Sequence, residues 1–89
     1  MERSTDTLIN FVYIGGNTYL PYESIIMLTD YSEPATKKIV KAAKEQDLLR
    51  DFSRGQSKET VAVTRSGFVF VTNMELYEVL GSANSEEKS

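Results

Sequence analysis

The sequence contains no histidine, no cysteine and no tryptophan among its 89 residues. Without cysteine there is no disulfide or thiolate chemistry, and without histidine the chain lacks the commonest general base and metal ligand. No stretch approaches the roughly 20 apolar residues of a membrane-spanning helix, and residues 1–7 lack the apolar segment of a signal peptide. We therefore expect a cytoplasmic protein that is not an enzyme, needs no metal or cofactor and has no membrane partner.

Two short patterns come near a catalytic or phosphate-binding motif without completing it. Asp47 and Asp51 lie four residues apart, but the arginines beside them make solvent-exposed ion pairs the better explanation. Gly55 is followed by Gln56 and Ser57, whereas a phosphate-binding loop needs a lysine and a hydroxyl residue directly after its glycine. The sequence therefore offers no nucleophile, base or metal cluster on which to build an enzyme.

The length of the chain predicts one domain with a small core. A domain of 89 residues buries a modest fraction of its surface, so its stability is expected to depend on association with other copies. We expect the domain to cover residues 7–81, between a disordered tail at 1–6 and a disordered acidic tail at 82–89. The length therefore favours a homo-oligomer.

Hydrophobic patterning predicts an α+β domain with a β-rich antiparallel sheet. Runs of β-branched and aromatic residues predict strands at 8–14, 18–21, 24–28, 60–64 and 68–72. Glycine and asparagine at 15–17 favour a tight turn between the first two strands, and residues 65–67 favour a turn between the last two. Residues 48 and 49 are expected to pack into the core, ahead of a loop at 51–58.

Two helices are predicted, and the first of them is amphipathic. The segment SEP at 32–34 is typical of a helix start with a serine cap, and the helix is expected to run to Gln46. A short C-terminal helix is expected over 74–80, between an Asn73 cap and Gly81. On the first helix we expect an apolar arc to be buried: Ala35, Ile39, Ala42 and Ala43. The opposite arc is basic: Lys37, Lys38, Lys41 and Lys44.

Charge is unevenly distributed along the chain. The net charge is −3, yet residues 37–65 hold eight basic and four acidic side chains, and the segments on both sides are acidic. A basic patch on an acidic protein can attract a polyanion locally, and it can equally be an ordinary solvated face. The sequence alone leaves both interpretations open for the face formed by Lys37, Lys41 and Lys44.

Three segments, taken in order, resemble one known family. They are FVYIGGNTYLPYESIIML (11–28), SEPATKKIVKAAKEQDLL (32–49) and GQSKETVAVTRSGFVFVT (55–72). Together they are similar to the RemA-like family of small bacterial proteins. The positions that match the frame of the family are these: Phe11, Ile14, Gly15, Asn17, Ser32, Pro34, Lys37 or Lys38, Ile39, Ala42 or Ala43, Leu48, Gly55, Val61, Val63 and Ser66.

The resemblance implies a function that composition does not reveal. RemA-like proteins are cytoplasmic DNA-binding regulators that activate extracellular-matrix and biofilm genes. The resemblance also implies a fold like the LytTR-type DNA-binding domain, assembled into a ring-shaped homo-oligomer around whose rim DNA can wrap. On this basis the expected partners are DNA, other copies of the chain and a related family member.

The arginines that contact DNA in the family are absent from this sequence. The family has two arginines after the loop glycine and one ahead of the third strand; the matching positions here are Gln56, Ser57 and Glu23. Basic residues nearby can compensate, and the spacing from Gly55 to Lys58 resembles the RemB-type branch of the family. The predicted DNA-binding residues are therefore Arg54, Gln56, Ser57, Lys58 and Arg65.

Two hypotheses follow from these observations. In the first, the protein is a ring-forming transcriptional regulator that binds DNA mainly through backbone and shape, with weak contacts multiplied by symmetry. In the second, it retains the fold and the assembly without binding DNA, and acts as a protein-interaction module. The loss of the three arginines and the acidic net charge favour the second.

Overall fold

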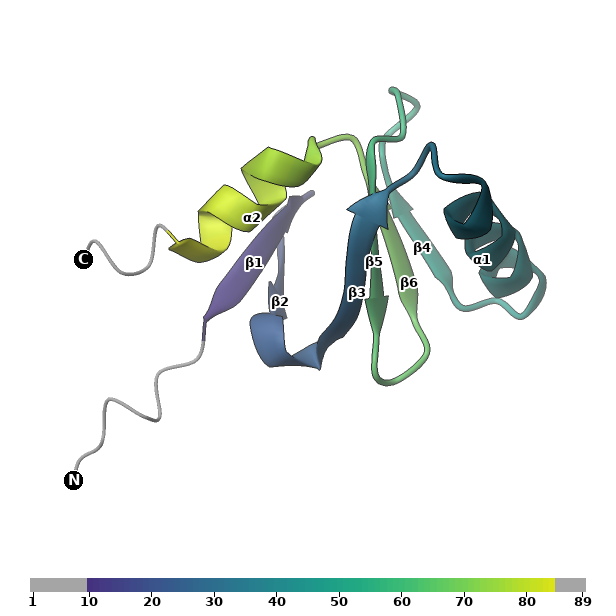
Figure 1. Cartoon of the computed structure of the whole chain (residues 1–89), viewed down its shortest axis with the longest axis horizontal. Coiled ribbons are helices and arrows are strands. Elements are labelled where there is room, and N and C mark those ends of the chain that lie inside the picture. The colour runs from purple at the N-terminus through teal and green to yellow at the C-terminus, as the bar shows by residue number, and fades with distance from the viewer. Residues whose placement is uncertain (1–9, 85–89) are drawn as a thin grey trace.

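The computed structural model describes residues 10–84, with side chains for residues 10–82. Within this range the chain forms a small α+β domain, as predicted (Figure 1). The predicted tail at 1–6 lies outside the described residues, as do residues 85–89. The described elements in chain order are β1 (Phe11–Gly15), β2 (Thr18–Pro21), the short 3-10 helix η2 (Tyr22–Ser24), β3 (Ile25–Asp30), α1 (Pro34–Glu45), β4 (Leu49–Phe52), β5 (Thr60–Thr64), β6 (Val69–Thr72) and α2 (Leu76–Asn84).

The first two strands form the predicted hairpin. Val12 pairs with Leu20 and Tyr13 with Tyr19, whose rings lie 4.8 Å apart between centroids. Gly16 and Asn17 form the two-residue turn, and both have a φ of 60°. Two successive positive φ values match the right-handed twist of a hairpin, and glycine and asparagine are the residues that adopt them most readily.

The other four strands form one mixed sheet in the order β3-β5-β6-β4. Strand β5 pairs antiparallel with both β3 and β6, whereas β4 pairs parallel with β6. Consequently β3 and β4 run in the same direction along the two outer edges, and α1 is the long connection that parallel strands require. The ends of β3, β4 and β6 therefore meet the start of β5 at one end of the sheet.

Helix α1 covers one face of this sheet. Its buried side chains, Thr36, Val40 and Ala43, follow the i, i+4, i+7 spacing of one helical stripe. Val40 and Ala43 pack against the valines that β5 and β6 direct toward the same face: Val61, Val69 and Val71. The rest of this small core is closed by residues around it that are partly buried: Tyr31, Ile39, Leu48, Leu49 and Val63.

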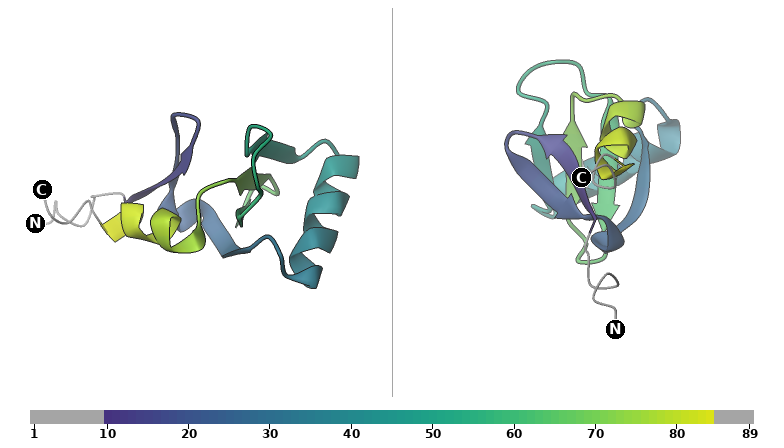
Figure 2. Two further views of the ribbon diagram at one scale, coloured as in Figure 1. Left: turned by 90° about the horizontal axis from the view of Figure 1, so that it is seen from above. Right: turned by 90° about the vertical axis from the view of Figure 1, so that its left-hand side faces the viewer.

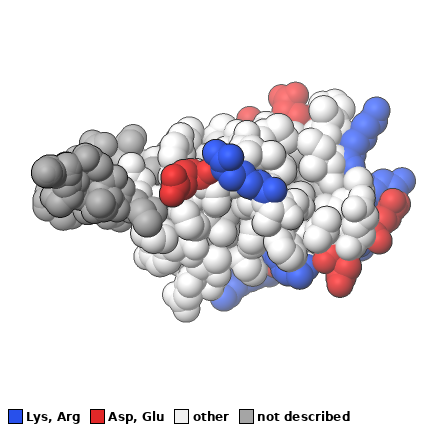
Figure 3. All heavy atoms as spheres, turned by 90° about the horizontal axis from the view of Figure 1, so that it is seen from below, with Lys and Arg blue, Asp and Glu red and all other residues white. Residues whose placement is uncertain are grey.

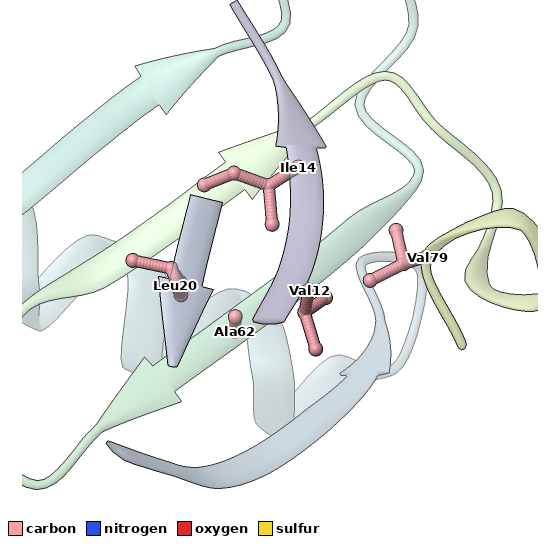
Figure 4. Close-up of a cluster of buried hydrophobic side chains, with 5 residues drawn as sticks. All are labelled: Val12, Ile14, Leu20, Ala62 and Val79. Atoms are coloured by element: carbon pink, nitrogen blue, oxygen red, sulfur yellow. The ribbon is translucent and has the colours of Figure 1, made fainter. Parts of the chain in front are cut away.

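The opposite face is covered by the β1–β2 hairpin and by α2, which packs beside β1. The buried side chains of this second cluster converge from four elements (Figure 4): Val12, Ile14, Leu20, Ala62 and Val79. The sheet is thus sandwiched between one helix and a hairpin-plus-helix layer. No helix within residues 10–84 is long and apolar enough to cross a membrane.

The structure corrects the predicted loop and the predicted start of the first helix. The segment 51–58 is not all loop, because residues 49–52 pair with β6 as strand β4. Helix α1 begins at Pro34 with Glu33 as its flanking residue and no side-chain cap, so Ser32 does not cap it. The helix also ends one residue before the predicted Gln46.

The buried face of α1 and the extent of α2 also differ from the prediction. Ala35 and Ala42 are exposed, and Thr36 and Val40 are buried in their place. Helix α2 spans Leu76–Asn84, so Gly81 lies inside it rather than at its end. Residues 82–84 therefore belong to α2 and not to a tail; Ser82 Oγ accepts a hydrogen bond from the Tyr13 backbone N–H at 2.9 Å.

Two neighbouring residues of α2 test whether this helix is part of the core. Val79 is fully buried and Leu80 is 41% exposed. We expect Val79→Ala to lower the free energy of unfolding by about 1–2 kcal/mol through lost packing, and Leu80→Ala to change it by less than about 0.5 kcal/mol. Urea unfolding followed by circular dichroism measures both variants. Equal losses would contradict the packing of α2 against β1.

Candidate nucleic-acid interface

The loop at residues 53–59 joins β4 to β5 and is fastened to the sheet at both ends. At its start the Ser53 backbone N–H donates to Oδ1 of Asp51 in β4 at 2.8 Å, and within the loop the Gln56 N–H donates to the Ser53 carbonyl at 2.9 Å. At its end Glu59 donates from its N–H to the Thr72 carbonyl, and its own carbonyl accepts from the Tyr31 N–H, both at 2.9 Å. The loop therefore projects from a fixed base at the end of the sheet where three strands finish.

Arg54 occupies the turn of this loop in an uncommon conformation. Arg54 and Gly55 have φ values of 56° and 78°, in the left-handed region that glycine adopts easily and other residues seldom do. A Cβ placed on Gly16 would lie 3.7 Å from Nη2 of Arg54, so the guanidinium lies against the β1–β2 turn. That turn and the 53–59 loop project from the same side of the molecule (Figure 2).

Gln56 and Ser57, which stand where the family has arginines, are both exposed. Gln56 Oε1 accepts a hydrogen bond from Asn73 Nδ2 at 2.8 Å. This bond ties the loop to the connection between β6 and α2. Helix α2 begins at Leu76, three residues after Asn73, so Asn73 does not stand at the cap position as predicted. The Ser57 side chain makes no hydrogen bond within residues 10–84.

Arg65 lies away from the loop. It follows β5, whereas the loop precedes β5, so the length of that strand separates them by about 15 Å. Its Nε donates to the Glu23 carbonyl at 2.9 Å, and its N–H donates to the Ser24 carbonyl at the same distance. The structure thus brings Arg54, Gln56, Ser57 and Lys58 into one loop and places Arg65 at the opposite end of the sheet.

A groove of about 490 Å³ runs between α1 and the edge of the sheet; we call it the lysine groove. Among the residues that line it are four lysines and a single carboxylate. The full lining is Tyr31, Lys37, Val40, Lys41, Lys44, Leu49, Asp51 and Lys58. Three of these lysines come from α1 and one from the 53–59 loop. The lysines of α1 and Lys58 of the loop therefore line one groove, which the sequence pattern did not predict.

The helical repeat explains which lysines reach the groove. An α-helix turns about 100° per residue, so Lys37, Lys41 and Lys44 each follow a buried residue by one position and share one flank of the buried stripe. Lys38 lies on the far side of the helix and does not line the groove. Lys37 and Lys38 thus have the same charge and are both exposed, but only Lys37 lines the groove.

Lys58 and Asp51 form an ion pair at the mouth of the loop, with Nζ 3.7 Å from Oδ2. Burial alone would raise the pKa of Asp51, but hydrogen bonds from the Ser53 hydroxyl (2.6 Å) and backbone N–H (2.8 Å), together with Lys58, outweigh that effect. The pKa of Asp51 therefore lies below its ordinary value. Asp51 is an ionised carboxylate at neutral pH.

The remaining lysines of the groove have no carboxylate partner within residues 10–84. Lys37 Nζ lies 5.7 Å from the centroid of the Tyr31 ring, and Lys41 and Lys44 are exposed. Like charges one helical turn apart destabilise a helix slightly. Three such ammonium groups on one wall, against one carboxylate that is already paired, form a site that favours an anion.

Acidic residues gather at a second pocket of about 330 Å³, which we call the acidic pocket. It is lined by Asp30, Glu59, Glu75, Leu76, Tyr77 and Leu80. On the face shown in Figure 3 a basic side chain beside an acidic one crosses the middle of a largely uncharged surface, and side chains of both signs gather at the end that α1 forms. Within residues 10–84 no group of three or more acidic side chains is placed to hold a metal ion.

No protein-family model and no curated protein sequence matches this chain. The similarity to the RemA-like family therefore rests on the residues quoted above and stays a prediction.

Replacing Ser53 by alanine tests the origin of the lowered Asp51 pKa. The Ser53→Ala variant loses the hydroxyl donor and keeps the backbone N–H, so we expect a higher Asp51 pKa, measured by carboxyl-carbon NMR titration. Because the folded pKa lies below the unfolded one, Asp51 stabilises the fold above its unfolded pKa, and this contribution is lost as the pH falls through the folded pKa. The variant should lose it at a higher pH. An unchanged titration midpoint, or an equal shift in the Ser57→Ala control, would contradict this assignment.

Proposed function

We propose that this chain is a RemA-like DNA-binding regulator that contacts the phosphate backbone of duplex DNA as a homo-oligomer. The observation that carries the proposal is the convergence of Lys37, Lys41, Lys44 and Lys58 on one groove that holds a single carboxylate. Arg54 adds a second basic group on the adjoining loop, where its guanidinium lies against the β1–β2 turn. In this proposal the protein acts in the bacterial cytoplasm on extracellular-matrix and biofilm genes, and its role is binding rather than catalysis.

The chemistry of the surface fits phosphate contact better than base recognition. Ammonium groups attract phosphates as point charges and release the counterions condensed on DNA, which supplies affinity without sequence information. Gln56 and Ser57 are exposed neutral groups that can donate weaker hydrogen bonds to the backbone or a base edge. Sequence preference would then come from DNA shape and deformability.

Assembly into a ring is part of the same proposal. The two outer strands of the four-stranded sheet, β3 and β4, have no further strand partner within residues 10–84. Since they run in the same direction, β3 of one copy can pair with β4 of the next in a head-to-tail manner, and such contacts close into rings. A ring repeats each weak phosphate contact, so the modest charge of one subunit is multiplied.

A second candidate function is supported by the acidic pocket and by the exposed apolar side chains in its lining. Tyr77 is 69% exposed and Leu80 is 41% exposed. Together with the absent family arginines, this surface favours an oligomeric protein-interaction module that co-assembles with a related family member and does not itself bind DNA. Failure to bind a duplex would favour this second function.

Fluorescence anisotropy of a labelled A·T-rich duplex tests the groove directly, at low salt and at about 150 mM salt. We expect saturable binding that weakens steeply with salt. In the Lys41→Gln/Lys44→Gln variant the slope of log K against log salt should fall by about 2, because two phosphate contacts are lost. Lys38→Gln is the matched control and should have little effect on the slope. An equal loss in Lys38→Gln would indicate a general effect of net charge.

The loop and the assembly are tested together by a double substitution. Arg54→Ala/Lys58→Ala should abolish duplex binding and leave the assembly intact. Light scattering should give, for the wild type and for this variant, a mass several times the 10.0 kDa of one chain. A monomer at micromolar concentration would contradict the ring, and loss of both binding and assembly would assign the loop a structural role.

A further inference from the structure

The lysine groove is too small for a duplex to enter. Its volume of about 490 Å³ lies in the range of roughly 300–1,000 Å³ that is typical of small-molecule sites. Its floor is apolar, because Val40 is 8% exposed and Leu49 is partly buried against the core. A duplex is a convex rod, so its phosphates can reach the lysines at the rim and leave the interior of the groove unused.

Three kinds of chemistry meet inside this groove. Lys37, Lys41 and Lys44 provide a row of ammonium groups, each one helical turn from the next. Tyr31 contributes an aromatic ring; the Lys37 ammonium lies over one face, 5.7 Å from the centroid, and because Lys37 is an exposed, flexible side chain, a base can take its place there while the ammonium moves to the phosphates. Asp51 contributes the single carboxylate, which its low pKa keeps ionised as a hydrogen-bond acceptor.

We infer that the lysine groove binds a ribonucleoside di- or triphosphate. The ammonium row holds the chain of phosphates, and the Tyr31 ring stacks on the base, as aromatic side chains do with unpaired bases. Asp51 accepts hydrogen bonds from ribose hydroxyls, the role that a carboxylate has in dinucleotide sites. Lys58, 3.7 Å from Asp51, offsets the repulsion between that carboxylate and the phosphates.

Each part of the ligand is therefore matched by a different wall of the groove. An inorganic polyphosphate would use the lysines alone and make no contact that requires the Tyr31 ring. A nucleoside without phosphates would use Tyr31 and Asp51 and leave three unpaired ammonium groups beside it. The combination favours a nucleotide over either fragment.

A nucleotide in the groove would compete with DNA, because both ligands use the same lysines. This consequence rests on the proposed function, whereas nucleotide binding itself does not. A nucleotide with two or three phosphates in the groove neutralises the charges that face the duplex, so DNA affinity would fall as nucleotide concentration rises.

Calorimetric titration of the full chain with ATP, tripolyphosphate and adenosine, in magnesium-free buffer, tests the inference. We expect ATP to bind about tenfold tighter than tripolyphosphate, because stacking adds to the phosphate contacts, and adenosine to bind more weakly than either. Tyr31→Leu should reduce ATP binding to the level of tripolyphosphate without changing tripolyphosphate itself. Tyr31→Phe keeps the ring and should retain the preference for ATP.

Charge variants complete the experiment. Lys41→Gln/Lys44→Gln should weaken ATP and tripolyphosphate alike, by about tenfold or more, and Lys38→Gln should leave both unchanged. Absence of ATP binding to the folded wild type overturns the inference, as does equal affinity for ATP and tripolyphosphate. Duplex binding without ATP binding would refute the nucleotide site and keep the proposed function; ATP binding by a protein that binds no duplex would do the reverse.

Discussion

Strand β5 is buried on both faces, and the alternation of its side chains determines which layer covers each face. Val61 points toward α1 and Ala62 toward the β1–β2 hairpin, and both are almost completely buried. Alanine at the second position leaves room for the larger side chains of β1, β2 and α2 to converge there (Figure 4). Because successive residues of a strand point to opposite sides, neither layer can shift along β5 by one residue without exposing its apolar set.

The position of β5 also divides the basic residues between two ends of the molecule. The 53–59 loop enters this strand and the Arg65 turn leaves it, so the two lie at opposite ends of the sheet (Figure 1). The parallel pairing of β4 with β6 then requires α1 to cross the sheet face between its two edges. That crossing places the flank of α1 that carries Lys37, Lys41 and Lys44 beside β4 and creates the lysine groove.

Much of the fold could be predicted from the sequence where local chemistry was decisive. The glycine–asparagine turn of the first hairpin and the strands rich in valine were predicted correctly because turn geometry and hydrophobic alternation act locally. Strand β4 was missed because its four residues, LRDF, include two charged side chains. An edge strand tolerates charged residues, so it need not show the hydrophobic pattern by which strands are recognised. Parallel pairing with β6 is a tertiary effect that no local pattern encodes.

The candidate site was less predictable than the fold for the same reason. The wheel calculation placed Ala43 in the core correctly, but Ala35 and Ala42 are exposed and the larger side chains of Thr36 and Val40 fill the core in their place. The buried stripe of α1 lies one residue further along the chain than predicted. Three lysines therefore lie beside this stripe, where they line the lysine groove, and not opposite to it: Lys37, Lys41 and Lys44. Tyr31 and Asp51 could not be assigned to that groove from the sequence, because their places depend on where β3 and β4 end.

Both the DNA-binding proposal and the nucleotide inference require phosphate groups to bind in the lysine groove. This requirement can be examined by NMR of the full chain with its lysines isotopically dimethylated, a modification that keeps their charge, during addition of a short A·T-rich duplex and, separately, of ATP. We expect both ligands to shift the signals of Lys37, Lys41, Lys44 and Lys58, and the Lys38 signal to stay in place. Shifts of equal size at Lys38, or none at the four groove lysines, would contradict it.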